Sequence, residues 1–173
     1  MRIAIIGIVI VALIGGGVWY FLATSDITES PAPSPFPKVS VTTLDGETVL
    51  LPDDYAGTPF VVGVWATWCA VCTSQLDSLR ILEEAHPSLV VLAVNRAEPA
   101  SDIAVYLERR GIAPSDLAVV IDTDDTLFPA IAGDLPSMPQ TLFVDADGTI
   151  QTHKRGSITP QEMERFASAL LEV

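Results

Sequence analysis

The sequence has few cysteines, few basic residues and few histidines, and each scarcity excludes a class of protein. Two cysteines among 173 residues, Cys69 and Cys72, are too few for a small domain held together by disulfides. Nine Lys and Arg residues against 22 Asp and Glu residues give a net charge of −13, which excludes nucleic-acid binding because phosphates would be repelled. His86, expected at a helix end, and His153, expected on a strand surface, lack ligand spacing, which argues against zinc.

An uncharged apolar segment near the start of the chain predicts a membrane anchor. Residues 3–22 contain no charged side chain, and a helix of about twenty residues spans ~30 Å, the thickness of a bilayer's hydrocarbon core. Arg2 precedes the segment and favours an N-terminus inside the cell, so the rest of the chain lies outside the cytoplasm. A cleaved signal peptide is the alternative, but residues 19–22 are bulky where cleavage needs small ones. Residues 1–24 are therefore predicted to anchor the protein in the inner or plasma membrane.

A proline-rich segment follows the predicted anchor. Within residues 25–37, every second position from Pro31 to Pro37 is proline, which favours polyproline II and excludes a helix or a central strand. At ~3.1 Å per residue, such a spacer holds a domain up to ~40 Å from the membrane. The folded domain is then predicted to occupy residues 38–173, about the length of one domain.

Short β-rich runs alternate with amphipathic runs from residue 38 onward. Asp45-Gly46 predicts the turn of a hairpin, and Thr159, Pro160 and Glu162 predict the capped start of the last helix. The alternation predicts an α/β domain with a central mixed sheet flanked by helices. Strands are expected at 39–44, 48–51, 60–65, 89–94, 118–121, 141–144 and 149–153, and helices at 71–85, 100–110, 125–132 and from residue 160.

The cysteine pair stands where a buried strand is expected to give way to a helix. Cys69 is predicted at the helix N-terminus, where free backbone N–H groups and the helix dipole stabilise a thiolate. Cys72 is predicted one turn further on the same face, within disulfide reach. An inert structural disulfide is the plainer reading, but so short a loop contributes little stability. The spacing therefore favours redox chemistry, with Cys69 as the attacking thiol and Cys72 as the resolving thiol.

Further motifs along the chain resemble one family. They are Leu44-Asp45-Gly46 with Leu51, Trp65-Ala66-Thr67-Trp68-Cys69, Val94-Asn95, Asp122-Thr123-Asp124, Met138-Pro139-Gln140-Thr141, and Phe143-Val144-Asp145 with Asp147-Gly148. With these, the sequence resembles the thioredoxin-like superfamily, specifically the membrane-anchored thiol-disulfide oxidoreductases of the TlpA/ResA type. The resemblance runs from about Val39 to Leu171. It implies a thioredoxin-like fold with an N-terminal β-hairpin extension and a single N-terminal transmembrane helix.

The resemblance also implies roles for residues around the cysteines. Pro139 would form a cis peptide bond beside the pair, and the backbone of Met138 would border the substrate groove and pair with a bound client. Trp68 is expected to be exposed beside Cys69 and to contact substrate. The two cysteines enclose only neutral residues, and no histidine stabilises the thiolate, which favours a reductant over an oxidant.

One position departs from the thioredoxin pattern. Thioredoxin has a buried aspartate six residues before its first cysteine, and this chain has Gly63 there. By family analogy, Glu98 is the acid expected to handle the proton of the resolving thiol. The plainer reading of Glu98 is a solvated loop residue that caps the next helix.

These expectations combine into a leading function. The protein is expected to reduce disulfides of specific extracytoplasmic client proteins, with no cofactor and no resident metal. By resemblance, the clients would be apocytochrome c haem-binding motifs or a copper-site protein of cytochrome oxidase. A transmembrane thiol carrier would supply the electrons.

Two other functions use the same cysteines. A Cu(I) chaperone would hold copper on Cys69 and Cys72 with Met138 as a soft third ligand, although no methionine-rich or histidine-rich segment accompanies the pair. A peroxidase is the weaker option, because the peroxiredoxin pattern has Thr three residues before the reactive cysteine and this chain has Ala66. Assays of Cu(I) binding and disulfide reduction separate the chaperone from the reductase.

Overall fold

The computed structural model describes residues 33–132 and 137–172. The predicted anchor and most of the predicted linker lie outside these residues. Among the helices that the structure does describe, none is long and apolar enough to cross a membrane.

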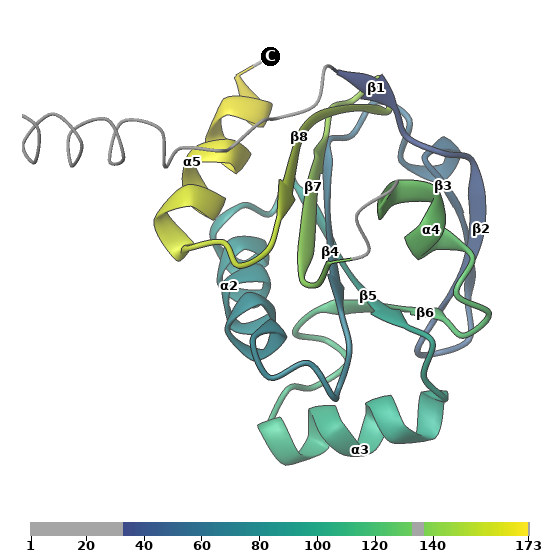
Figure 1. The fold of residues 1–173 in the computed structure, drawn as a ribbon. Helices are drawn as coiled ribbons and strands as arrows, with labels where there is room; N and C mark the ends of the chain where they lie inside the picture. The colour runs from purple at the N-terminus through teal and green to yellow at the C-terminus, as the bar shows by residue number, and fades with distance from the viewer. Residues whose placement is uncertain (1–32, 133–136, 173) are drawn as a thin grey trace, which may run out of the picture.

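The described strands form one mixed sheet in the order β1-β8-β7-β4-β5-β6-β2-β3 (Figure 1). At its centre, β4, β5 and β6 run parallel, and β7 pairs with β4 in the antiparallel direction. The N-terminal hairpin β2–β3 extends the sheet through an antiparallel pairing of β2 with β6. The strands are β1 (Ser34–Pro35), β2 (Val39–Thr43), β3 (Thr48–Leu51), β4 (Phe60–Trp65), β5 (Val90–Arg96), β6 (Ala118–Asp122), β7 (Gln140–Val144) and β8 (Thr149–Arg155). The predicted α/β class and mixed sheet are confirmed.

The helices begin and end close to where the sequence signals predict. Gly111 closes α3 in the left-handed conformation at φ 66°, which a side chain would disfavour. Thr159 and Glu162 form the expected capping box at the start of α5. The short 3₁₀ helix η1 was not expected. The helices are α2 (Cys72–Ala85), α3 (Ala100–Arg110), α4 (Leu127–Ala132), α5 (Pro160–Leu171) and η1 (Asp53–Tyr55).

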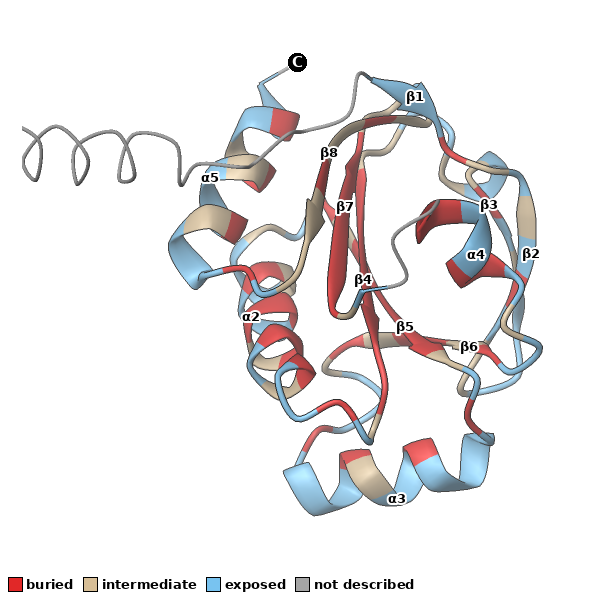
Figure 2. Cartoon of the chain, in the orientation of Figure 1, coloured by how far each residue is buried: buried red, intermediate tan, exposed pale blue. Residues whose placement is uncertain are grey.

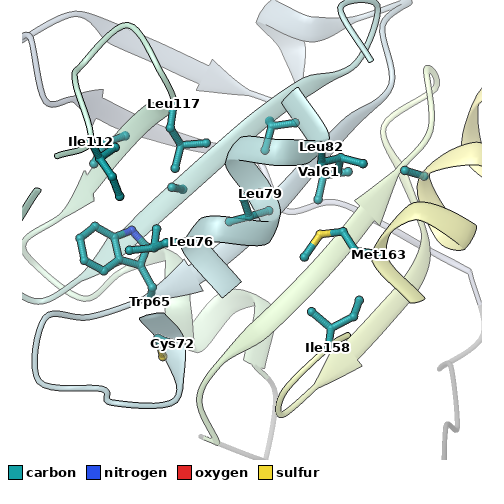
Figure 3. Packing of buried hydrophobic residues seen from close by; sticks show 14 of the residues in the cluster. Val61, Trp65, Cys72, Leu76, Leu79, Leu82, Ile112, Leu117, Ile158 and Met163 are labelled. Atoms are coloured by element: carbon teal, nitrogen blue, oxygen red, sulfur yellow. The ribbon is translucent and has the colours of Figure 1, made fainter. Parts of the chain in front are cut away.

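The central strand β4 is buried on both faces, as its continuous apolar sequence predicts (Figure 2). Alternate side chains point to opposite sides of the sheet. Val61 and Trp65 join one core cluster with residues of α2, α3 and α5. Phe60, Val62 and Val64 join a second cluster with residues of α4. Figure 3 shows part of the first cluster, in which Leu76 and Leu79 of α2 lie near Trp65 and Val61.

The last residues of the predicted linker pack on the domain, which differs from a spacer running to residue 37. Strand β1 pairs Ser34 with Ile150 and Pro35 with Thr149 at the edge of the sheet. Phe36 is buried and packs edge-on against Phe60, with ring centroids 5.4 Å apart. The proline pattern is compatible with this arrangement because proline is tolerated on an edge strand.

The structure corrects the expectation that His153 lies on the surface. His153 is buried on β8, and its Nε2 lies 2.7 Å from Oε1 of Gln140. Burial, with a smaller contribution from Arg155, lowers the pKa of His153 to about 4. His86 is at the end of α2, as predicted, and its Nε2 lies 2.9 Å from Glu164 of α5.

Candidate active site

The cysteine pair lies in the turn that joins β4 to α2. A disulfide links Cys69 and Cys72, whose Cα atoms are 5.3 Å apart. The Cys69 N–H donates to the carbonyl of Ala66, and the Cys72 N–H donates to the carbonyl of Cys69. Cys72 is the first residue of α2 rather than one turn inside it, so Cys69 precedes the helix. Cys69 still lies at the N-terminal end of α2, where the helix dipole favours negative charge.

The two cysteines differ in their access to solvent. Cys69 is 6% exposed and Cys72 is completely buried. On either side of Cys69, Trp68 is 64% exposed and Val71 is 55% exposed. The expected exposure of Trp68 is therefore observed. Cys69 is therefore the more accessible of the two cysteines, and two exposed apolar side chains lie beside it in the chain.

Met138 and Pro139 lie where the chain enters β7. Their peptide bond is cis, as the resemblance implied, and Pro139 is buried. Met138 is partly buried and packs against the cluster that contains Cys69 and Cys72. Met138 also packs against the cluster on the opposite face of the sheet. The structure thus places Met138 at the boundary between the two cores.

Gln75 connects the cysteine-bearing helix to the strand after Pro139. Its side chain is 1% exposed, and its Nε2 donates to the backbone carbonyl of Gln140 at 2.9 Å and to Oγ1 of Thr141 at 2.8 Å. Sequence reasoning missed this residue. The available signal was a polar residue on the helix face that carries Cys72, Leu76 and Leu79.

Glu98 lies behind the loop that precedes Cys69. It is 8% exposed, and its carboxylate accepts hydrogen bonds from the Thr67 N–H at 2.7 Å, from the Thr67 hydroxyl and from Nδ2 of Asn95 at 2.8 Å. The reading of Glu98 as a solvated helix cap is wrong, because the N-cap of α3 is Pro99 and no side chain caps that helix. Glu98 instead holds the loop that carries Trp68 and Cys69.

The packing of α2 explains why no acid occupies position 63. Gly63 lies at the centre of β4, and a Cβ atom there would overlap the side chain of Leu79. Leu79 is completely buried. An aspartate at this position would require the buried Leu79 side chain to repack.

Within the described part of the chain, no group of three or more His, Cys, Asp and Glu side chains is arranged to hold a metal ion.

Comparison with known sequences places the chain in a family. The sequence profile of the AhpC/TSA family matches residues 33–153. The chain belongs to the AhpC/TSA family. The thiol-disulfide oxidoreductase ResA of Geobacillus kaustophilus is 29% identical over 175 residues, covering 98% of this chain and 94% of ResA. The thioredoxin-like protein YneN of Bacillus subtilis is 26% identical over 170 residues, covering 92% of this chain and 93% of YneN.

A solved structure supports the fold. The crystal structure of a putative thiol:disulfide interchange protein DsbE from Chlorobium tepidum matches with a TM-score of 0.70 at 20% identity, covering 83% of this chain and 99% of that one. This AhpC/TSA family member therefore has the thioredoxin-like fold. It is a thiol-disulfide oxidoreductase of the ResA/DsbE type, and Cys69 and Cys72 are its cysteine pair.

Proposed function

We propose that the protein is a membrane-tethered extracytoplasmic reductase of client-protein disulfides. The observation that carries the proposal is the unequal exposure of the linked pair, since Cys69 reaches the surface and Cys72 does not. This inequality supports Cys69 as the attacking thiol and Cys72 as the resolving thiol.

The reaction begins with the reduced form of the pair. The Cys69 thiolate attacks one sulfur of the client disulfide, the client S–S bond breaks, and the released client thiolate takes up a proton. The Cys72 thiolate then attacks Sγ of Cys69 in the mixed disulfide. This step releases the second client thiol and forms the Cys69–Cys72 disulfide. Two electrons pass from the protein to the client, so a dithiol donor must reduce the pair before the next cycle.

Three residues are proposed to hold the client. The ring of Trp68 offers an exposed apolar surface beside Cys69. Met138 packs against the cluster that contains the pair, and its backbone is proposed to align an extended client segment in the manner of β-augmentation. Pro139 places that backbone at the entrance to β7.

Glu98 is proposed to serve the resolving step. Its buried carboxylate is held by Thr67 and Asn95 close to the cysteine loop, so it can receive or return a proton there through the loop's polar groups. The same carboxylate also fixes Thr67, which precedes Trp68 and Cys69 in the chain.

The proposed direction of electron transfer, the proposed clients and the proposed location rest on the sequence and on the family that it resembles. Neutral residues between the cysteines and the lack of a neighbouring histidine favour a reductant. Clients of the cytochrome c maturation or copper-site assembly type, and a transmembrane thiol electron donor, are proposed on the resemblance. The uncharged residues 3–22 support a single-pass anchor in the inner or plasma membrane with the domain on the extracytoplasmic side.

The proposal is tested by disulfide reduction with defined variants. The wild-type protein with dithiothreitol should accelerate the reduction of insulin, and Cys69→Ser should abolish the effect. Cys72→Ser should accumulate a mixed disulfide with client proteins in the native host, because no resolving thiol remains. Preferential trapping by Cys69→Ser would reverse the assignment of roles.

A titration with Cu(I) tests the alternative function of a copper chaperone. Tight stoichiometric Cu(I) binding without insulin reduction would favour the chaperone, with Cys69, Cys72 and Met138 as ligands. Consumption of hydrogen peroxide at a rate above that of disulfide reduction would favour a peroxidase instead.

A further inference from the structure

Arg96 is held in a fixed position at the end of β5 that faces the site. Its Nε donates to Oδ1 of Asp125 at 2.8 Å and its Nη2 donates to Oδ2 at 2.9 Å. The centre of the guanidinium group lies 3.8 Å from the centroid of the Phe128 ring on α4. A two-pronged ion pair and an aromatic contact leave this planar group little freedom to rotate.

The remaining guanidinium nitrogen of Arg96 faces Met138. Nη1 lies 3.9 Å from the Sδ atom of Met138, and the arginine side chain is 23% exposed. Met138 precedes Pro139 and packs against the clusters on both faces of the sheet. Arg96 therefore contacts the proposed client-binding residue from the face opposite the cysteine pair.

We propose that Arg96, fixed by Asp125 and Phe128, is a positioning residue that holds the Met138 side chain as one wall of the client groove. Methionine has three rotatable side-chain bonds and adapts to its surroundings, so its position depends on what packs against it. A rigid guanidinium group beside Met138 holds the Met138 side chain in one conformation before the client binds. Less side-chain conformational entropy is then lost on binding. The inference rests on the proposed function, because it concerns how that site recognises protein clients.

The test compares two disulfides in single-turnover reduction by the pre-reduced protein. One substrate is a synthetic peptide with an internal Cys-x-x-Cys disulfide and flanking residues on both sides. The other is hydroxyethyl disulfide, a small disulfide that has no peptide segment to lie along Met138. Arg96→Gln should raise the half-saturating peptide concentration about five-fold and leave the maximal rate and the hydroxyethyl disulfide rate within about two-fold of wild type.

Two further variants separate positioning from general damage. Asp125→Asn keeps the positive charge of Arg96 but weakens the ion pair that holds it. This variant should raise the half-saturating peptide concentration less than Arg96→Gln does. Asparagine tolerates the positive φ of 51° at this position. In a Met138→Ala background, Arg96→Gln should have no further effect, because Arg96 acts through the side chain that has been removed. Additive effects of the two changes would overturn the inference.

Arg110 provides a matched control. Its Nη2 donates to both carboxylate oxygens of Asp77, at 3.0 and 2.9 Å, so it is also an arginine in an ion pair with an aspartate. Arg110→Gln should leave both reactions unchanged. The inference would be overturned if Arg96→Gln slowed the reduction of the peptide and of hydroxyethyl disulfide equally, or if it changed neither reaction. A wild-type protein that reduces neither substrate would instead overturn the proposed function.

Discussion

Gln75 joins the first turns of the cysteine-bearing helix to β7. Its amide donates to the Gln140 carbonyl and the Thr141 hydroxyl, and Thr141 and Gln140 are fully buried. Loss of the amide removes a donor from both acceptors in a dry environment, which costs more than the net gain of an ordinary hydrogen bond. This single side chain therefore ties the position of α2 to the segment that follows Pro139.

Gln75→Leu should lower the free energy of unfolding by about 2 kcal/mol, because it keeps the volume and removes the donor. Urea denaturation followed by circular dichroism measures the change. Glu84→Gln, an exposed change on the same helix, serves as the control and should stay within about 0.5 kcal/mol of wild type. A Gln75→Leu variant as stable as the control would show that these hydrogen bonds contribute nothing to stability.

His153 gives the protein a pH-dependent stability. Burial lowers its pKa from 6.5 to about 4, so the folded state binds the proton less readily than the unfolded state. Above pH 6.5 neither state holds the proton and His153 has no effect. As the pH falls from 6.5 to 4 the unfolded state gains the proton first, so stability decreases.

We expect the wild-type protein to lose up to about 3 kcal/mol between pH 6.5 and pH 4 through this group. His153→Gln, which cannot take up a proton, should show a correspondingly smaller loss across the same interval. Urea denaturation at several pH values checks this expectation. Parallel stability curves for the two proteins would contradict the low pKa of His153.

At the scale of an element, α5 is defined by its N-terminal capping box. The Thr159 hydroxyl accepts from the Glu162 N–H, and the Glu162 carboxylate accepts from the Thr159 N–H. The hydrogen bond from the Thr159 backbone, followed by one from Lys154, lowers the pKa of Glu162 to about 2. The ionised carboxylate therefore stabilises the helix above pH 4.5, and this contribution is lost as the pH falls toward 2.

Thr159→Ala should lower the free energy of unfolding by about 1 kcal/mol at neutral pH, because the Glu162 N–H loses the Thr159 hydroxyl as its acceptor. Gln161→Ala, an exposed change in the same turn, is the control. Thermal unfolding with both variants measures the difference. If Thr159→Ala matched Gln161→Ala, the capping box would be irrelevant to the stability of α5.

At the scale of the whole molecule, Phe36, which precedes the predicted start of the domain at residue 38, completes the second core cluster. Phe36 packs with Phe60 at the end of the sheet where β1 pairs with β8, and the Phe36 N–H donates to the carbonyl of Gly148 at 2.8 Å. The folded domain thus begins inside the segment that its prolines suggested was a spacer. Any tether to a membrane is correspondingly shorter.

Phe36→Ala should lower the free energy of unfolding by about 3 kcal/mol, because it removes a buried ring and leaves a cavity against Phe60. Leu50→Ala is the control, since Leu50 is 49% exposed and should change stability by less than about 0.5 kcal/mol. Both values come from urea denaturation of the whole chain. If Phe36→Ala lowered the free energy of unfolding no more than Leu50→Ala does, the segment that contains Phe36 would not belong to the cooperatively folded domain.

The sequence by itself determined the features that depend on near neighbours in the chain. The turn at Asp45-Gly46, the Gly111 helix end and the Thr159 capping box each use residues within a few positions, so local chemistry specifies them. The cysteine pair and its place between a buried strand and a helix are local in the same sense. These features were sufficient to predict the mixed α/β fold and the redox site.

Only the tertiary structure decided which polar and aromatic side chains become buried or find distant partners. The amide nitrogen of Gln75 donates to Gln140 and Thr141, which lie 65 and 66 positions further along the chain. His153 pairs with Gln140 on the neighbouring strand, and Arg96 pairs with Asp125. Phe36 is likewise buried by residues distant in the sequence. A side chain's own type does not show whether such partners will reach it, because burial and pairing depend on how sheet and helices come together.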